Sequence, residues 1–498
     1  MKKTKRIPKI FLFVLTCILA LNMKSKGFAQ NELDNEILTF PIEDNLKLGN
    51  YNPDDLRVKQ LGKIELNRVL TKSEYEKDMK NFISYYLEWQ AYLGNSTREE
   101  LEKLGEELLK TSDNKTVSDL NLDFAKLIAN TNDGHTSAMY EIGKSCMPIK
   151  IRIINGDYYI INTTPEYEDL LYSKILKLAD IDTKDITERL YKYTSAENKY
   201  FKKTIIKDFY LYYGDALEKE NIIKNGELKL QIETDGKKLN KTIKMIDLPD
   251  VKISKYSYEN TDFSHIIYDM TDIAKNKFTK NDKMRYMQMK PFHYYINDNN
   301  LIIQYNNCYN TDKDNILEKM IEKMDKDVSE NNVEKIIVDV RYNTGGWPAH
   351  ARELELALKR YQLLNPKLEI KLLTGSKNYS AGSLFVDGVK RNFDNLQIIG
   401  ENTGGPSGWT TLTSTIMYLG NSKLFVKKSS GVRRYDYTLE DVVHCSNLNK
   451  RDGLTWYPDM FIENQIQDYA IGNDRVMNYA LRDEGNNSLF DKINGIFN

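Results

Sequence analysis

The sequence has few of the features that mark several common classes of protein. Its 498 residues carry a formal net charge of −1, which argues against a nucleic-acid-binding protein, because such proteins present a basic surface. No CxxC or HxxxH spacing occurs, so the pattern supports no metal site, and we expect no cofactor. The proportions of hydrophobic (41%) and charged (29%) residues are those of an ordinary globular protein, and the length suggests more than one domain.

Long apolar runs are absent beyond the N-terminus. The chain begins with a basic segment, KKTKR, followed by the apolar run IFLFVLTCILALNM and the small-x-small triplet Gly27-Phe28-Ala29. This order predicts a secretory signal peptide over residues 1–29, with cleavage after Ala29. The run is shorter than the ~20 residues of a membrane span, and no later segment is long enough to cross a bilayer. We therefore expect a secreted or periplasmic protein with no stable membrane span after cleavage.

Cysteine is scarce in the mature chain. Signal cleavage would leave Cys146, Cys308 and Cys445. Because three is an odd number, at most one disulfide can form and at least one thiol stays free. A chain of this length buries a large hydrophobic core without needing disulfides for stability.

Histidine is also scarce, with five in the chain. His135 lies in the turn Asp133-Gly134-His135-Thr136, directly after the segment NLDFAKLIAN, which has helical periodicity. Asp-Gly is common in turns, and a histidine beside it is usually solvated. A histidine held in place by a helix is also a candidate general base or metal ligand near neutral pH. This stretch alone leaves both interpretations open.

The chain divides into regions of different periodicity. Capping-box patterns at 71–74 (TKSE) and 96–99 (STRE) precede helical patterns and predict a helical N-terminal domain over residues 30–145. From Met147 the period changes to two, and the segments PIKIRIINGDYYIINTT and ELKLQIETDGKKLNKTIKMI read as β-hairpins, which predicts a small β-rich domain over residues 146–248. Residues 249–295 show no clear period and are interpreted as an irregular linker.

Residues 296–498 alternate between strand and helix patterns. The strands NLIIQYN, KIIVDVRYN, IKLLTG and LQIIG are separated by the helices DNILEKMIEKMDKDV, PAHARELELALKRY and SAGSLFVDGVKRN. Pro348 suits the first turn of the second helix. This order predicts an α/β layered core with a largely parallel sheet. The fold class is therefore α/β and multi-domain.

Glycine turns follow two of the core strands. The first strand ends at Asn343-Thr344-Gly345-Gly346, where backbone N–H groups can stabilise an oxyanion, although glycine is also the default residue of a packing turn. The second lies in LQIIGENTGGPSGW, where Gly404 and Gly405 are interpreted as lining a substrate cleft and the alternative is a long flexible turn.

Ser380 lies at the start of a predicted core helix, in the segment LLTGSKNYSAGSLFVDGVK. A serine at this position is commonly an N-cap. The same geometry suits a nucleophile, because the hydroxyl is exposed and the positive end of the helix favours developing negative charge. Ser376 and Ser383 are nearby serines for which we expect no such role.

The ordered set of motifs resembles the tail-specific, or C-terminal-processing, serine peptidases, in the branch that includes the tricorn protease core, and above all its secreted bacterial members with a helical N-terminal domain. The likeness covers most of the chain from about residue 70. It rests on the segments DGHT at 133–136, DVRYNTGG at 339–346, YSAG at 379–382, GENTGG at 400–405 and PD at 458–459. The resemblance implies a crotonase/Clp-like α/β core and a PDZ-like middle domain over residues 146–248, in divergent form and without a recognisable carboxylate-binding loop.

The resemblance also implies roles for individual residues. Ser380 would be the nucleophile and His135 the general base, with oxyanion donors in the N–H of Gly345 or Gly346 and of Ala381. The other branch of the family uses a lysine about twenty-five residues after the serine. Here that position is occupied by a glycine (Gly405), which favours the histidine mechanism.

The third member of a triad stays open at this stage. The tricorn-like branch has a glutamate shortly before its Pro-Asp element, and the equivalent spacing falls near Asp452. Glu440 and Asp441 are rivals, because the surrounding segment aligns poorly.

The leading prediction is a secreted serine endopeptidase that hydrolyses extended or unfolded polypeptides. Polypeptide would be its partner, and no nucleic acid is expected. The alternative is a catalytically inactive peptide- or ligand-binding protein on the same scaffold. A thiol nucleophile at Cys445 beside His444 is disfavoured, because adjacent residues of a strand point to opposite faces. His350, at a helix start, is expected to be solvated, and His293 is placed in the irregular region.

Overall fold

The structure is a computed structural model that describes residues 63–88, 96–139, 141–254, 257–259, 291–310, 316–393, 395–434, 455–471 and 473–482, and the strand β1 (Ile37–Pro41). The predicted signal peptide at residues 1–29 lies outside this part of the chain, as do the triad candidates Asp452, Glu440 and Asp441 and the rejected pair His444 and Cys445. Among the helices that the structure describes, none is long and apolar enough to cross a membrane.

The C-terminal core is built on a six-stranded sheet with the order β13-β14-β15-β16-β17-β20. All neighbours are parallel except β13 and β14, which pair antiparallel. The predicted α/β core with a largely parallel sheet is confirmed. The strands are β13 (Phe292–Asn297), β14 (Asn300–Tyr305), β15 (Lys335–Asp339), β16 (Glu369–Thr374), β17 (Leu396–Gly400) and β20 (Met460–Phe461). The sheet begins within the segment predicted to be irregular, and His293 lies on its first strand.

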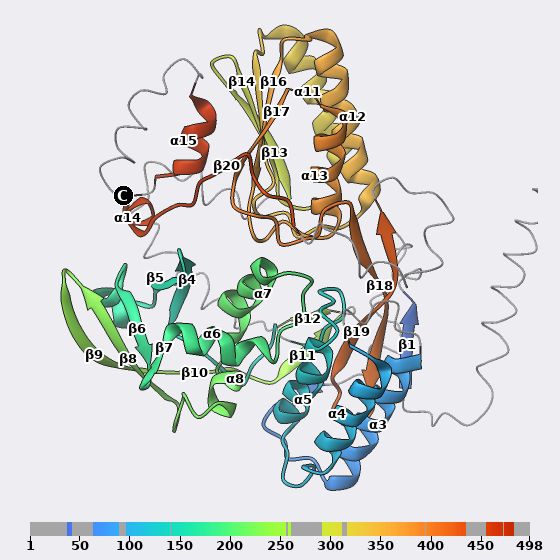
Figure 1. Ribbon diagram of the computed structural model, residues 1–498, viewed down its shortest axis with the longest axis vertical. Coiled ribbons are helices and arrows are strands. Elements are labelled where there is room, and N and C mark those ends of the chain that lie inside the picture. Colours follow the sequence, from blue (N-terminus) through green and yellow to red (C-terminus); the bar gives the residue numbers. More distant parts are fainter. Residues whose placement is uncertain are drawn as a thin grey trace, which may run out of the picture.

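The central strands are apolar throughout because helices cover both faces of the sheet. Figure 1 shows α11 (Leu317–Glu330), α12 (Pro348–Leu364) and α13 (Ala381–Asn392) on one face and α15 (Arg475–Leu481) on the other. Successive residues of β15 point to opposite faces of the sheet: Ile336 packs against α11, α12 and α13, and Ile337 packs against α15. This two-sided burial explains why the strands read as continuous apolar runs.

The N-terminal region contains the helices α3 (Lys72–Glu88), α4 (Arg98–Leu109) and α5 (Val117–Ala129). The capping box predicted at 71–74 is present, with reciprocal hydrogen bonds between Thr71 and Glu74. The box predicted at 96–99 was wrong by one residue, because Thr97 and Glu100 form it. The Ser96 hydroxyl instead donates to the carbonyl of Asn130, at the end of α5.

The middle region forms a second sheet with the order β4-β5-β6-β8-β9, and β7 (Ile181–Asp182) pairs with β6. Both predicted hairpins are present, with Asn155-Gly156 and Asp235-Gly236 at positive φ in their turns, as two-residue hairpin loops require. The strands are β4 (Ile149–Ile154), β5 (Asp157–Thr163), β6 (Lys174–Leu178), β8 (Glu227–Thr234) and β9 (Lys237–Lys244), with helices α6 (Thr183–Tyr191), α7 (Lys199–Ile205) and α8 (Gly214–Lys219). The PDZ-like interpretation stays a prediction.

A long hairpin joins the core to the N-terminal helices. Its strands, β18 (Trp409–Leu419) and β19 (Phe425–Arg434), extend from the core toward α3 (Figure 1), and Met417 and Phe425 pack in the same apolar cluster as the N-terminal helices. Backbone hydrogen bonds of 3.0 and 2.9 Å link Ser137, just after the histidine turn, to Lys427 of β19. The hairpin therefore fixes the histidine turn relative to the core.

The two cysteines in the described residues, Cys146 and Cys308, are buried free thiols. Burial raises the pKa of each to about 11. Both therefore behave as small apolar residues, and neither is a reactive thiolate.

A buried ion cluster ties the end of β15 to helix α15. The guanidinium of Arg341 donates to Asp339 Oδ2 at 2.6 Å and to Asp474 Oδ2 at 2.7 Å. Asp474 also caps α15 by accepting from the backbone N–H of Met477. Because all three charged groups are buried, removal of one partner leaves an uncompensated charge in the interior.

We predict that Asp474→Ala lowers the free energy of unfolding by about 3–5 kcal/mol, because Arg341 loses a buried partner. The matched control is Glu330→Gln, which removes an exposed partner of Lys326. This substitution should change the free energy of unfolding by less than about 0.5 kcal/mol. Urea denaturation followed by circular dichroism measures both. Equal midpoints for the two variants would contradict the assigned role of the cluster.

Candidate active site

The histidine turn is held by a buried carboxylate. Asp133 is completely buried, and its Oδ1 accepts the backbone N–H of His135 at 3.1 Å. Its Oδ2 accepts from Thr136 Oγ1 at 2.6 Å and from the hydroxyl of Ser429 on β19. These contacts fix the position of His135, so the solvated-turn interpretation is wrong.

Ser380 connects β16 to α13 in an unusual backbone conformation. Its φ of 55° and ψ of −127° are rare for a residue with a side chain, and such strain is found preferentially at functional sites. Ser380 occupies the N-cap position of α13, but its hydroxyl makes no capping hydrogen bond. Instead, Ser380 Oγ lies 2.8 Å from His135 Nε2, although 245 residues separate the two in the sequence. The fold thus brings together the two residues that the motifs singled out.

The other imidazole nitrogen faces two hydroxyl groups. His135 Nδ1 lies 2.9 Å from Thr411 Oγ1 and 2.9 Å from the Tyr379 hydroxyl. Thr411 donates its own proton to Asp133 Oδ1 at 2.7 Å, so its oxygen presents a lone pair to the ring. The pattern of donors therefore assigns the proton of the neutral ring to Nδ1 and leaves Nε2 free to accept from Ser380.

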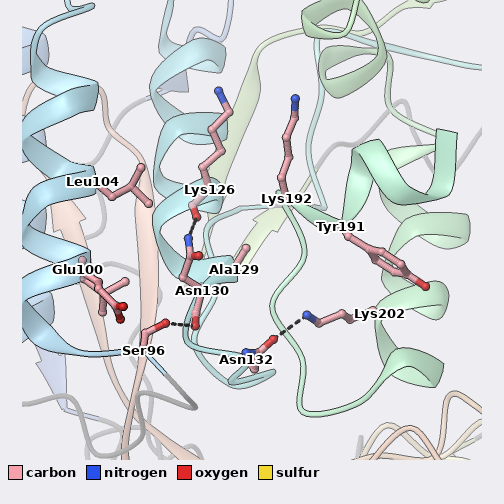
Figure 2. Close-up of a pocket in the computed structure, with 11 residues that line it drawn as sticks. Ser96, Glu100, Leu104, Lys126, Ala129, Asn130, Asn132, Tyr191, Lys192 and Lys202 are labelled. Atoms are coloured by element: carbon pink, nitrogen blue, oxygen red, sulfur yellow. Dashed lines mark hydrogen bonds between the residues drawn. The ribbon is translucent and has the colours of Figure 1, made fainter. Parts of the chain in front are cut away.

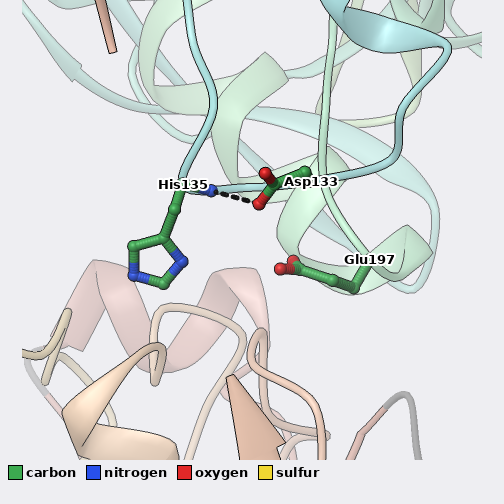
Figure 3. Close-up of side chains that lie close together, drawn as sticks. All are labelled: Asp133, His135 and Glu197. Carbon is green, nitrogen blue, oxygen red and sulfur yellow. Dashed lines mark hydrogen bonds between the residues drawn. The ribbon is translucent and has the colours of Figure 1, made fainter. Parts of the chain in front are cut away.

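Two carboxylates lie behind these hydroxyls. The Tyr379 hydroxyl donates to Glu197 Oε1 at 2.8 Å, and Thr411 lies 3.3 Å from the same oxygen. Figure 3 shows Asp133 and Glu197 on the same side of the imidazole ring of His135, with Glu197 on a separate segment of the chain. Carboxylates thus reach the imidazole side chain through Thr411 and Tyr379, in place of the direct contact of a simple triad.

Burial controls the protonation of this group. Burial lowers the pKa of His135 to about 4. The charge of Asp133 opposes that shift, and the charge of Lys427 increases it. Burial raises the pKa of Glu197 to about 8, and the nearby charge of Asp133 acts in the same direction. Near pH 7 the imidazole is therefore neutral and Glu197 carries a proton. A neutral imidazole is the form that can accept a proton from a serine hydroxyl.

The glycine turn after β15 packs directly against Ser380. A Cβ atom at Gly345 would lie 2.6 Å from Ser380 Cβ, and one at Gly346 would lie 2.8 Å from the carbonyl of Cys308, so both positions require glycine. The N–H of Gly345 donates to Asn343 Oδ1 at 2.9 Å. Within the part of the chain that the structure describes, the N–H groups of Gly346 and Ala381 have no acceptor.

The predicted cleft glycines occupy packed positions. Gly404 and Gly405 are buried, and Cβ atoms there would lie 2.3 Å from the carbonyl of Ser376 and 1.8 Å from Ser383 Oγ. This packing explains glycine at both positions without any contact with a substrate. Asp452, the predicted third member, lies outside the described residues, so the structure does not place it.

The sequence patterns missed most of the residues around His135 Nδ1. The sequence pattern indicates only a turn at Asp133, and Tyr379 enters only as the neighbour of Ser380 in a motif. Thr411 and Glu197 lie in segments without a motif, and they reach the site only through the packing of distant regions. No local pattern marked either of them.

Two groups of side chains in the described residues have the composition of a cation site. Asp133, His135 and Glu197 offer ligand atoms within 4.8 Å of one another. These atoms are already satisfied by Thr411 and Tyr379, so the group is complete without an ion. The second group, on α11 and α12, consists of Glu318, His350 and Glu353.

A pocket of about 810 Å³ lies behind the histidine turn. Figure 2 shows Asn132, in the turn after α5, facing Lys202 of the middle region. Lys202 Nζ donates to Asn132 Oδ1 at 2.6 Å. Neither His135 nor Ser380 lines this pocket, so it is separate from the candidate active site.

We predict that His135 titrates with a midpoint near pH 4, far below the ordinary value of 6.5, in a ring-proton NMR titration of the folded protein. Lys427→Met should raise the midpoint, because a positive charge that opposes protonation is removed. The lowered pKa of His135 by itself makes stability fall as the pH is lowered from 6.5 toward 4, because the unfolded state takes up that proton first, whereas the raised pKa of Glu197 acts in the opposite direction. A wild-type midpoint between 6 and 7 would contradict the neutral imidazole.

Comparisons with known proteins identify the fold. No protein-family model and no curated sequence matches the chain. Solved structures do match: a point mutant of CPAF has 13% identity and a TM-score of 0.54, over 82% of this chain and 96% of that one. Mature CPAF complexed with lactacystin has 12% identity and a TM-score of 0.52, over 82% and 97%. The tricorn protease matches at 13% identity over 82% of this chain and 36% of that one, but its TM-score of 0.36 is too low to support an argument. The chain therefore has the fold of CPAF.

Proposed function

We propose that the protein is a serine peptidase of the tail-specific type, with Ser380 as nucleophile and His135 as general base. The observation that carries the proposal is the 2.8 Å contact between Ser380 Oγ and His135 Nε2. A serine hydroxyl becomes an effective nucleophile when a base within hydrogen-bond reach accepts its proton. The contact joins two motifs that the family resemblance already paired.

Acylation follows from this arrangement. Ser380 Oγ attacks the carbonyl carbon of the peptide bond while its proton passes to His135 Nε2, and the carbonyl oxygen becomes an oxyanion. The N–H groups of Gly346 and Ala381 are the proposed oxyanion donors, because neither has an acceptor within the described residues. Ala381 directly follows Ser380, and Gly346 directly follows Gly345, which packs against Ser380. The N–H of Gly345 is engaged by Asn343. His135 then gives the proton to the leaving amine, and water hydrolyses the acyl-enzyme by the same steps in reverse.

A buried carboxylate assists the imidazole. When His135 accepts the serine proton it becomes a cation, and Asp133 stabilises that charge through Thr411. The Tyr379 hydroxyl also links the ring to Glu197, which carries a proton near pH 7. In this proposal Asp133, acting through Thr411, takes the part that the carboxylate has in a simple triad.

The substrate class is extended or unfolded polypeptide. Acyl transfer from a peptide bond matches the nucleophile, base and oxyanion donors described above. The N-terminal pattern at residues 1–29 supports export, so we propose that the peptidase acts in a secreted or periplasmic location. The inactive-scaffold alternative is disfavoured, because the serine and histidine are in hydrogen-bond contact.

We predict that Ser380→Ala lowers kcat/KM for cleavage of a casein-like unfolded substrate by at least about 10³-fold, since the nucleophile is lost. Ser383→Ala is the matched control. Its hydroxyl is buried on the same helix without a hydrogen-bond partner, so activity should stay within about twofold of wild type. Unchanged cleavage by Ser380→Ala would rule out the assignment, whatever the control shows.

A second prediction concerns the two hydroxyls at Nδ1. Tyr379→Phe and Thr411→Val should each lower kcat by about 10-fold or more, because each removes one path from the imidazole to a carboxylate. The double variant should lose more than either single variant, and KM should change little. Steady-state kinetics as a function of pH measures the effect. A loss confined to KM would show that these side chains shape substrate binding and do not support the base.

A further inference from the structure

A second group of potential ligands lies on the helices next to the glycine turn. His350 and Glu353 are one turn apart on α12, and Glu318 is in the first turn of α11. His350 Nδ1 lies 3.5 Å from Glu353 Oε2 and 3.7 Å from Glu318 Oε1. One atom from each residue falls within 4.8 Å of the others. His350, which was expected to be solvated, has a side chain that is 18% exposed.

Two polar atoms of this group are buried without a hydrogen bond, although the side chains of Glu318 and Glu353 are partly exposed. His350 Nδ1 and Glu353 Oε2 are both shielded from solvent, and neither has a hydrogen-bond partner among the described residues. A buried polar atom left in this state costs about 1–3 kcal/mol. Two such atoms that face each other at 3.5 Å indicate that something else satisfies them in the working protein.

A third unsatisfied group points to the same place. Tyr305 is completely buried, and its hydroxyl makes no hydrogen bond beyond a contact with the weakly polar thiol of Cys308. Burial is the largest cause that raises the pKa of Tyr305, followed by its contact with Cys308, and the charges of Glu353 and Glu318 add to the shift. Tyr305 is therefore a buried phenol close enough to the two carboxylates to be affected by their charge.

A simple ion pair does not account for the spacing. A charge-assisted hydrogen bond between imidazolium and carboxylate is about 2.7–2.9 Å long, and both nitrogen–oxygen distances here exceed that range. Two ligands that each lie about 2.1 Å from a tetrahedral Zn²⁺ are about 3.4 Å apart. The observed separations of 3.5 and 3.7 Å are close to that value. The two nitrogen–oxygen separations are therefore those expected of ligands around a shared cation, and the oxygens of Glu318 and Glu353 lie within 4.8 Å of each other.

We propose that Glu318, His350 and Glu353 form a binding site for a divalent transition metal ion of the Zn²⁺ class. One imidazole nitrogen and two carboxylate oxygens suit such an ion, and a 2+ charge balances the two carboxylates. Glu318 and Glu353 are partly exposed, which gives the ion access from solvent. Asn310 donates to the second oxygen of Glu318 at 3.2 Å and orients that carboxylate.

The ion would act as a clamp between α11 and α12. Helix α12 starts at Pro348, directly after the turn that carries Gly346 and Trp347. The other side of that turn packs on Cys308. A metal that joins the first turns of the two helices therefore stabilises the base of the glycine turn. Metal binding itself does not depend on the proposed peptidase activity.

Isothermal titration of chelator-treated protein with ZnCl₂ tests the site. One equivalent should bind, and His350→Ala and the conservative Glu353→Gln should each weaken binding by about 100-fold or more, because each removes a ligand. His135→Ala is the matched control and should keep the stoichiometry, since it alters only the other group of ligand atoms. Zn²⁺ should also raise the Tm of wild type but not that of His350→Ala.

Two outcomes would overturn the metal site. One is the absence of stoichiometric binding to folded wild-type protein, with folding verified by circular dichroism. The other is binding that survives in Glu353→Gln but disappears in His135→Ala, which would place the ion in the active-site group. Because the readout is metal binding, loss of peptidase activity in Ser380→Ala leaves the result unaffected.

Discussion

One buried carboxylate, that of Asp133, holds the candidate active site together. It accepts hydrogen bonds from Thr136 and the backbone of His135 in the turn, and from Thr411 and Ser429 on the long hairpin. A buried carboxylate is costly unless its oxygens are satisfied. The turn and the hairpin therefore stabilise each other, and the imidazole is positioned as a consequence.

The site is assembled from three regions of the chain. Ser380 belongs to the core, His135 to the N-terminal region and Glu197 to the middle region. Asn198, next to Glu197, donates to the carbonyl of Gly404 at 2.7 Å and so docks the middle region onto the core. A change in that docking would move Glu197 relative to the serine turn. The geometry of the candidate site thus depends on the packing of the regions as well as on Ser380 and His135.

The sequence predicted the parts of the fold that depend on local pattern. Apolar strand patterns that alternate with helix patterns predicted the parallel core. The glycine motif predicted the turn at Gly345 after a core strand, and the small residues around Ser380 predicted the start of a helix there. His135 became a candidate general base because its motif and that of Ser380 occur in the order found in the family that the chain resembles. Glu197 and Thr411 could not be predicted, because their contacts arise from tertiary packing across more than 180 residues. For the same reason no sequence pattern indicated that His350 is partly buried beside two glutamates.

The most direct test of the account is the identity of the residue that a serine-directed phosphonate modifies. Tandem mass spectrometry of the labelled, proteolysed protein locates the adduct. The account predicts an adduct on Ser380, formed at a rate that falls sharply in His135→Ala, because the base that activates the hydroxyl is missing. An adduct on another residue, or a labelling rate unaffected by His135→Ala, would contradict it.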